Sequence, residues 1–138
     1  MDYIHTVQYY ETDKMGITHH SNYIRWMEEA RVDFLSQIGW DYARLEEEGI
    51  VSPVLTVNCE YKYPTKFSEK VIIKVSVKEF RGVKLFLDYE MKNEDGKVVC
   101  LGTSSHGFLN AEGKPIRMKN AFPEFSELLG KLAEGAEA

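Results

Sequence analysis

The sequence predicts an α+β fold in which one curved antiparallel sheet packs around a single long helix. Two observations carry this prediction. One long segment repeats its apolar residues every three or four positions, which is the period of an amphipathic helix. The segments that follow it alternate apolar with polar residues, which is the period of half-buried strands. A strand, a long helix and then several consecutive strands together form an α+β layout.

The first predicted strand covers residues 3–10, where β-branched and aromatic residues mix with polar ones. Residues 11–19 contain Asp, Lys, Gly and Thr without periodicity and are predicted to form a loop. The long helix then begins near His20 and ends at Gly39. Its repeating apolar residues are Tyr23, Met27, Ala30, Phe34 and Ile38. Because further apolar residues lie on its other sides, the helix is expected to be buried on more than one side.

The second half of the chain is predicted to be mostly strands. A shorter helix at 41–48 stops at Gly49, and the later strands are predicted at 51–63, 68–80, 83–93 and 97–110. Residues 93–97 form a hairpin turn, because Asp95-Gly96 supplies the positive φ that such turns need. Residues 111–115 close the last strand, and a short helix follows at 123–132. We expect one domain over residues 1–138, with the last residues, 133–138, frayed.

Composition limits the partners that the chain can be expected to have. A net charge of −5 leaves no basic excess to neutralise phosphates, so nucleic acid is not the expected partner. No apolar run reaches membrane-spanning length and the N-terminus lacks a secretory signal pattern, so we expect a cytoplasmic protein without a membrane partner. Cys59 and Cys100 lie in strand-like runs without metal-ligand spacing and are expected to be reduced, partly buried thiols.

The residues with the clearest chemical meaning lie just before and at the start of the long helix. Taken alone, Asp13 is an ordinary loop carboxylate, and His19 and His20 are ordinary surface or capping histidines. Gly16 between them permits a tight turn that brings the carboxylate back toward the helix start. A helix start offers unpaired N–H groups that can hold a developing oxyanion. Together these residues could attack a carbonyl or activate a water molecule.

The same region resembles the acyl-CoA thioesterases of the 4-hydroxybenzoyl-CoA thioesterase type. Their signature is an Asp, a Gly three residues on, a His seven on, a Tyr ten on, and Glu-x-Ala-Arg within the helix. The matching residues here are Tyr9-Tyr10-Glu11-Thr12-Asp13, Gly16, His20, Asn22-Tyr23 and Glu28-Glu29-Ala30-Arg31. The remaining chain matches in outline, with Tyr61-x-Tyr63-Pro64 after the first long strand of the later sheet.

This resemblance implies a hotdog fold and dimers with active sites at the subunit interface, often paired into homotetramers. It implies that Asp13 acts as nucleophile or general base and that a backbone N–H near His20 polarises the thioester carbonyl. The His20 side chain would orient substrate or water, or help to protonate the leaving thiolate. Gly16 and Tyr23 would contribute to the substrate pocket, with Tyr23 packing against Asp13 and the pocket wall. No metal and no organic cofactor are implied, because coenzyme A is part of the substrate.

Other expectations concern charged and polar residues outside the signature's Asp13 and His20. Glu28 or Glu29 with Arg31 is expected to form an ion pair at an interface or on the helix surface. Coenzyme A phosphates need cations, and Arg81 with Gly82, followed by Lys84, is the favoured position because glycine permits close approach. Lys62, Lys66 and Lys70 cluster nearby in sequence, but ordinary solvated strand ends are the favoured interpretation of each of them. Ser104, Ser105 and His106 lie on one strand and could face the pocket, or could equally be structural. Lys14, Met15 and His19 depart from the family pattern, which leaves the choice of substrate open.

Several alternatives remain at this stage. The same fold can serve an acyl carrier protein thioesterase, which would need basic patches near the pocket mouth, or, less plausibly, a hydratase or dehydratase. A non-catalytic acyl-thioester-binding module is a different class, against which the retention of both Asp13 and His20 argues. A metal hydrolase is not expected from the spacing of the four histidines. No Ser or Cys lies in a nucleophile-elbow context.

Overall fold

The computed structural model describes residues 2–135, so the fraying expected for the last residues falls partly outside the described residues. The elements are β1 (Tyr3–Thr6), η1 (Tyr9–Glu11), α1 (Ser21–Gln37), α2 (Tyr42–Glu47), β2 (Val54–Tyr61), β3 (Lys70–Phe80), β4 (Lys84–Lys92), β5 (Val98–Gly107), α3 (Met118–Ala121) and α4 (Pro123–Ala133). None of the described helices is long and apolar enough to cross a membrane.

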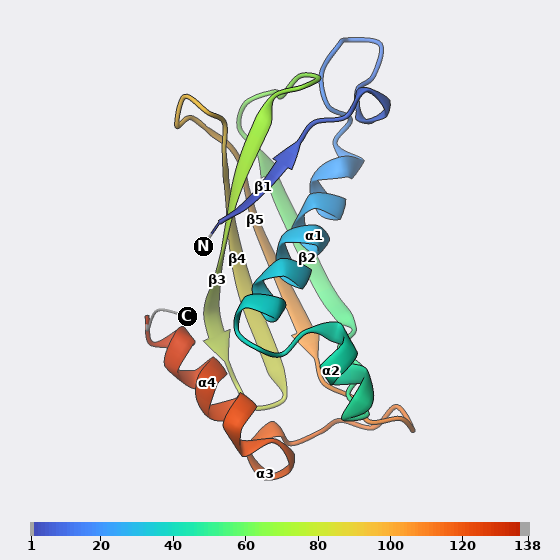
Figure 1. The fold of residues 1–138 in the computed structure, drawn as a ribbon, viewed down its shortest axis with the longest axis vertical. Coiled ribbons are helices and arrows are strands. Elements are labelled where there is room, and N and C mark those ends of the chain that lie inside the picture. The colour runs from blue at the N-terminus through green and yellow to red at the C-terminus, as the bar shows by residue number, and fades with distance from the viewer. Residues whose placement is uncertain (1, 136–138) are drawn as a thin grey trace.

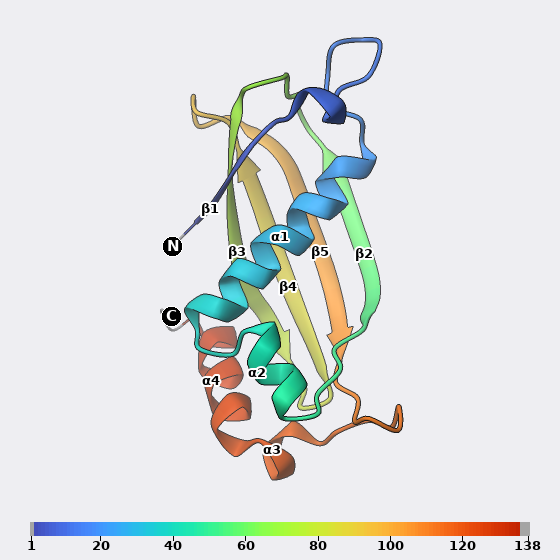
Figure 2. The same ribbon diagram turned by 45° about the vertical axis from the view of Figure 1, so that its right-hand side comes forward.

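The strands form one antiparallel sheet in the order β1-β3-β4-β5-β2, and α1 lies across one face of it (Figure 1). The loop before α1 lies at one end of the molecule. The turn between β3 and β4 lies at the other end, with α2, α3 and α4 (Figure 2). The predicted α+β fold, with a sheet around a long helix, is confirmed. β1 and β2 are the two edge strands.

Two local predictions differ from the structure. The strand predicted at 3–10 ends at Thr6, and residues 9–11 form a 3-10 turn. The turn is stabilised because the Glu11 carboxylate accepts a hydrogen bond from the Gln8 N–H over 2.7 Å. The short helix α3 was not predicted, because four residues are too few to show a helical period. Its Met118 side chain is fully buried, and the Met118 backbone N–H donates a hydrogen bond to the Gly82 carbonyl, which holds the helix by a tertiary contact.

The core lies between α1 and the inner face of the sheet. Leu87, Tyr89 and Met91 alternate inward from β4 and are buried, as the period of two predicted. Gly102 of β5 lets α1 approach the sheet closely. A Cβ added there would lie 3.0 Å from the Cε atom of Met27 and 3.3 Å from a backbone oxygen of β2. A side chain at this position would therefore be tight, and Met27 or β2 would have to shift to make room for it.

A chain of buried polar groups connects α1 to the middle of the sheet. Arg31 is buried, and its guanidinium donates to Nδ1 of His106 over 2.9 Å. The other ring nitrogen of His106 bonds Ser104 Oγ over 2.7 Å, and Ser104 bonds the Tyr89 hydroxyl over 2.7 Å. Arg31 therefore does not form the expected ion pair on the helix surface. Ser104 and His106 face α1 and belong to this internal chain.

The buried chain makes stability depend on pH. Burial, reinforced by the positive charge of Arg31, lowers the pKa of His106 from 6.5 to about 4. In the unfolded chain His106 binds a proton as the pH falls below 6.5. In the folded protein it binds that proton only when the pH reaches about 4. The free energy of unfolding should therefore fall across this window, by up to about 3 kcal/mol from this group.

Urea unfolding of the wild type and His106→Gln at several pH values between 4 and 7 tests this. The variant should lose much less stability across the window than the wild type, whatever its stability at neutral pH. Parallel pH profiles for the two proteins would contradict the assignment.

Candidate active site

The loop before α1 is a tight, internally bonded turn. Thr12 and Thr18 pair across its base. The Asp13 N–H bonds the Ile17 carbonyl over 2.9 Å, and the Asp13 carbonyl accepts from the Gly16 N–H over 3.0 Å. Gly16 has a φ of 77°, a conformation that favours glycine. The glycine turn that the sequence suggested is therefore present, and it bends the loop back toward the helix.

The Asp13 carboxylate is fixed at one oxygen and open at the other. Its Oδ1 atom accepts the Met15 N–H over 2.8 Å, which sets the orientation of the side chain. Within residues 2–135, Oδ2 makes no hydrogen bond. The side chain is partly exposed and lines a cavity of about 370 Å³. Such a carboxylate has a fixed direction and one oxygen free for chemistry.

The start of α1 offers one free backbone donor. The N–H of Ser21 bonds Nδ1 of His19, and the N–H groups of Asn22 and Tyr23 bond the carbonyls of His19 and His20. For the N–H of His20, the described part of the chain supplies no acceptor. This donor lies at the positive end of the helix dipole, where it can stabilise negative charge on an oxygen atom.

The cavity brings three predicted site residues together. Asp13 enters from the loop, His20 from the helix start and Tyr23 from the first turn of α1. Gly16 shapes the loop but does not line the cavity. The opposite wall comes from Tyr61 at the end of β2 and the residues just after it. The elements that meet here are therefore the loop, the helix start and the end of an edge strand.

Tyr23 forms part of the cavity wall, and its hydroxyl is already hydrogen-bonded within the protein. It is 4% exposed, its ring centroid lies 5.1 Å from that of Tyr61, and its hydroxyl bonds Thr65 Oγ1 over 3.1 Å. Burial raises the pKa of Tyr23 above its ordinary value. Thr65 also bonds the Thr18 hydroxyl over 2.6 Å. These buried hydroxyls tie the loop to α1, and nothing local in the sequence indicated Thr65.

Arg81 and Gly82 lie far from this cavity within one chain. They form the turn after β3, whose eleven residues span roughly 35 Å from the end near the cavity. The Arg81 guanidinium pairs with Glu79 over 2.9 Å. Lys62, one of the alternative basic candidates, does line the cavity.

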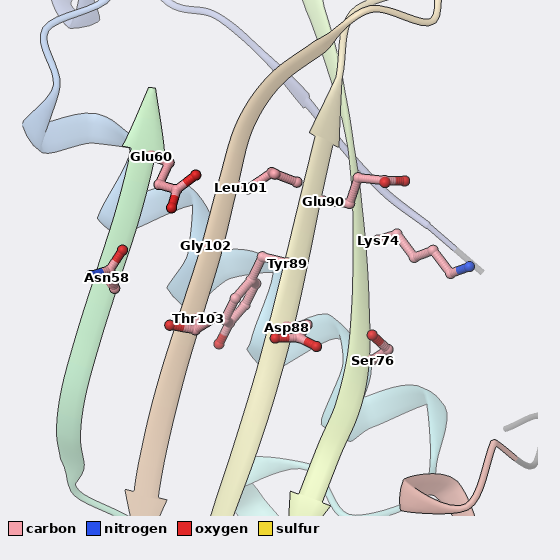
Figure 3. A pocket seen from close by; sticks show the side chains of 10 residues that line it. All are labelled: Asn58, Glu60, Lys74, Ser76, Asp88, Tyr89, Glu90, Leu101, Gly102 and Thr103. Atoms are coloured by element: carbon pink, nitrogen blue, oxygen red, sulfur yellow. The ribbon is translucent and has the colours of Figure 1, made fainter. Parts of the chain in front are cut away.

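A second hollow, of about 420 Å³, lies on the sheet face turned away from α1 (Figure 3). Glu60, Asp88 and Glu90 line it together with Lys74. It offers carboxylates, but its lining includes no histidine and no helix start. It therefore lacks the pairing of a carboxylate with a helix start that the first cavity offers.

Glu11 lies in the run that resembles the family, but the sequence indicated no role for it. Its buried carboxylate accepts hydrogen bonds from His5 Nε2 over 2.8 Å, from Trp26 Nε1 over 2.7 Å and from the Gln8 N–H. Burial alone would raise the pKa of this carboxyl, but these donors outweigh it and hold the pKa below its ordinary value. An acidic residue within an aromatic run was the signal available in the sequence.

A five-stranded antiparallel sheet packed on one long helix is the hotdog fold, and the similar solved structures include thioesterases of this fold. Residues 7–131 match the family model of the Thioesterase-like superfamily. The chain therefore belongs to this superfamily. Its sequence relatives and the similar solved structures include thioesterases, so it is a thioester hydrolase.

Relatives cover most of the chain. A Bacillus subtilis protein named "Putative acyl-CoA thioesterase YneP" is 36% identical over 120 residues, which are 86% of this chain and 87% of that protein. The DHNA-CoA thioesterase from Staphylococcus aureus is 34% identical, with a TM-score of 0.91 over 99% of this chain and 95% of its own. The gentisyl-coenzyme A thioesterase BH1999 is 25% identical, with a TM-score of 0.80 over 89% of this chain and 99% of its own.

Glu11→Gln should lower the free energy of unfolding by about 1 to 3 kcal/mol, because a neutral amide cannot satisfy three buried donors as the carboxylate does. Since the folded pKa of Glu11 is lowered, the stabilisation that it provides is present above the ordinary pKa and is lost as pH falls below it. Urea unfolding at pH 7 measures the loss. The exposed Glu112→Gln is the matched control and should stay within about 0.5 kcal/mol of wild type. Equal stabilities for the two variants would contradict the role of Glu11.

Proposed function

We propose that this protein hydrolyses acyl-CoA thioesters to a free acid and coenzyme A. The observation that carries the proposal is the meeting, in one cavity, of the free carboxylate oxygen of Asp13 with the helix start at His20. The relatives support the choice of thioester, since each of the three names a coenzyme A thioesterase activity.

In this reaction the thioester carbonyl oxygen accepts a hydrogen bond from the backbone N–H of His20. The free oxygen of Asp13 either attacks the carbonyl carbon or removes a proton from a water molecule that attacks it. The carbon–sulfur bond then breaks, and the thiolate of coenzyme A leaves and takes up a proton, which the His20 imidazole can deliver. Direct attack leaves an anhydride on Asp13 that water must cleave, whereas the water route gives the acid in one step.

We also infer that a second copy of this chain pairs with edge strand β2. All but one of the residues of β2 are exposed, including Val54, Leu55 and Val57. An exposed apolar edge strand offers a row of free backbone groups to another strand. Antiparallel pairing about a two-fold axis would bring the start of the partner's β2 beside the cavity at Tyr61. It would also turn the Arg81 end of the partner toward this cavity, so Arg81 and Gly82 could serve coenzyme A only from the partner.

Asp13→Asn should reduce hydrolysis by at least about 100-fold, because the amide can neither attack nor accept a proton. The measurement is thiol release from acetyl-CoA, decanoyl-CoA and benzoyl-CoA. Asp88→Asn, in the hollow on the outer face, is the matched control and should keep wild-type activity.

Two results would count against this function. Full activity of Asp13→Asn on a substrate that the wild type hydrolyses would remove Asp13 from the reaction. Turnover of an acyl group only on acyl carrier protein, with none on coenzyme A, would replace the proposed substrate class.

Val57→Lys should convert the dimer to a monomer, because it places a charge on the apolar edge that pairs. Ile4→Lys is the control on the other edge strand, where the side chain is 57% exposed, and it should stay dimeric. Light scattering after gel filtration gives the mass of each species. A monomeric wild type, or a dimeric Val57→Lys protein, would reject β2 as the interface.

A further inference from the structure

The His20 imidazole is held by rings rather than by hydrogen bonds. Within residues 2–135 its side chain has no hydrogen-bond partner, although it lines the cavity. Its ring stacks on that of His19 with centroids 4.3 Å apart and planes 29° apart. On another side the Tyr61 ring meets it edge-on, with centroids 6.2 Å apart. Neither ring nitrogen of His20 has a hydrogen-bond partner among the described residues, so the contacts that orient the ring are those with the His19 and Tyr61 rings.

His19 itself is rigidly held. Its Nδ1 atom accepts the Ser21 N–H over 3.2 Å and lies 2.9 Å from Ser21 Oγ. Its backbone N–H bonds the Glu11 carbonyl over 2.8 Å, and its own carbonyl accepts the Asn22 N–H over 3.0 Å. The Ser21 N–H can only donate, so Nδ1 of His19 is the acceptor in that contact. The ring is therefore a fixed flat surface at the start of α1.

We propose that His19 is a positioning residue that holds the His20 imidazole in its working orientation. The proposal rests on the function proposed above, in which His20 delivers a proton to the leaving thiolate. A proton donor works only when it is aligned with the atom that receives the proton. An imidazole at an exposed helix start can populate several rotamers, and stacking on a fixed ring favours one of them. His19 acts through its ring, without touching the substrate.

Two substitutions separate the ring of His19 from its hydrogen bonds. His19→Phe keeps a flat ring but loses the acceptor for the Ser21 N–H. His19→Asn keeps a side-chain acceptor, which suits a helix start, but loses the ring. If the ring positions His20, kcat for acyl-CoA hydrolysis should fall about tenfold in His19→Asn with KM within about twofold, and His19→Phe should keep kcat within about twofold. If His19 serves only as a helix cap, the order of the two variants is reversed.

A second measurement does not depend on activity. The ring protons of His20 should show NOE contacts with the Tyr61 ring in the NMR spectrum of the free protein, kept in His19→Phe and lost or weakened in His19→Asn. Unchanged His20–Tyr61 contacts in both variants, or equal kcat losses in both, would overturn the proposal. A wild type that hydrolyses none of the acyl-CoA substrates would overturn the proposed function, and the His20–Tyr61 contacts would still decide whether His19 orients His20.

Discussion

The buried carboxylate of Glu11 is the contact on which the arrangement of the site depends. It accepts hydrogen bonds from His5 of β1 and from Trp26 of α1, and so joins these two elements. A charge buried at 4% exposure is tolerated only because hydrogen-bond donors surround it. Its own backbone carbonyl accepts the His19 N–H and the Asn22 amide. One residue thus fixes the first strand, the helix and the junction between loop and helix relative to one another.

This constraint explains how the loop that contains Asp13, the residue proposed as catalytic, is held in place although it lies at the surface. The loop leaves Glu11 at one end and returns to it at the other, where His19 bonds the Glu11 carbonyl. Thr18 is tied further to Thr65, so the end nearest the helix is anchored twice. Asp13 lies between these anchors, with one oxygen held by the Met15 N–H. These anchors hold both ends of the loop, and in the proposed reaction such preorganisation is the condition for electrostatic stabilisation of a transition state.

The sequence predicted what depends on local pattern and missed what depends on distant partners. Periodicity located the long helix and the strands, and Asp13 with His20 could be grouped because a short glycine turn separates them. Thr65 lies 47 residues from Thr18, and nothing local marks their contact. Arg31 was expected to form an ion pair with Glu28 or Glu29 on the helix surface or at an interface, but its hydrogen-bond acceptor, His106, is 75 residues away. Such contacts follow from strand order, which one sequence does not specify.

The two edge strands of the sheet, β1 and β2, differ in length and in the apolar surface that they expose, and this difference bears on the proposed function. β1 has four residues, whereas β2 has eight and exposes apolar side chains along its length. A long exposed apolar edge promotes aggregation unless another strand covers it. The candidate cavity lies at the end of this same strand, with Tyr61 in its wall. In the proposed dimer, the pairing that covers β2 therefore also closes the cavity, so that assembly and completion of the site become one event. A thioesterase built in this way would lose its activity on dissociation even though each chain kept its fold.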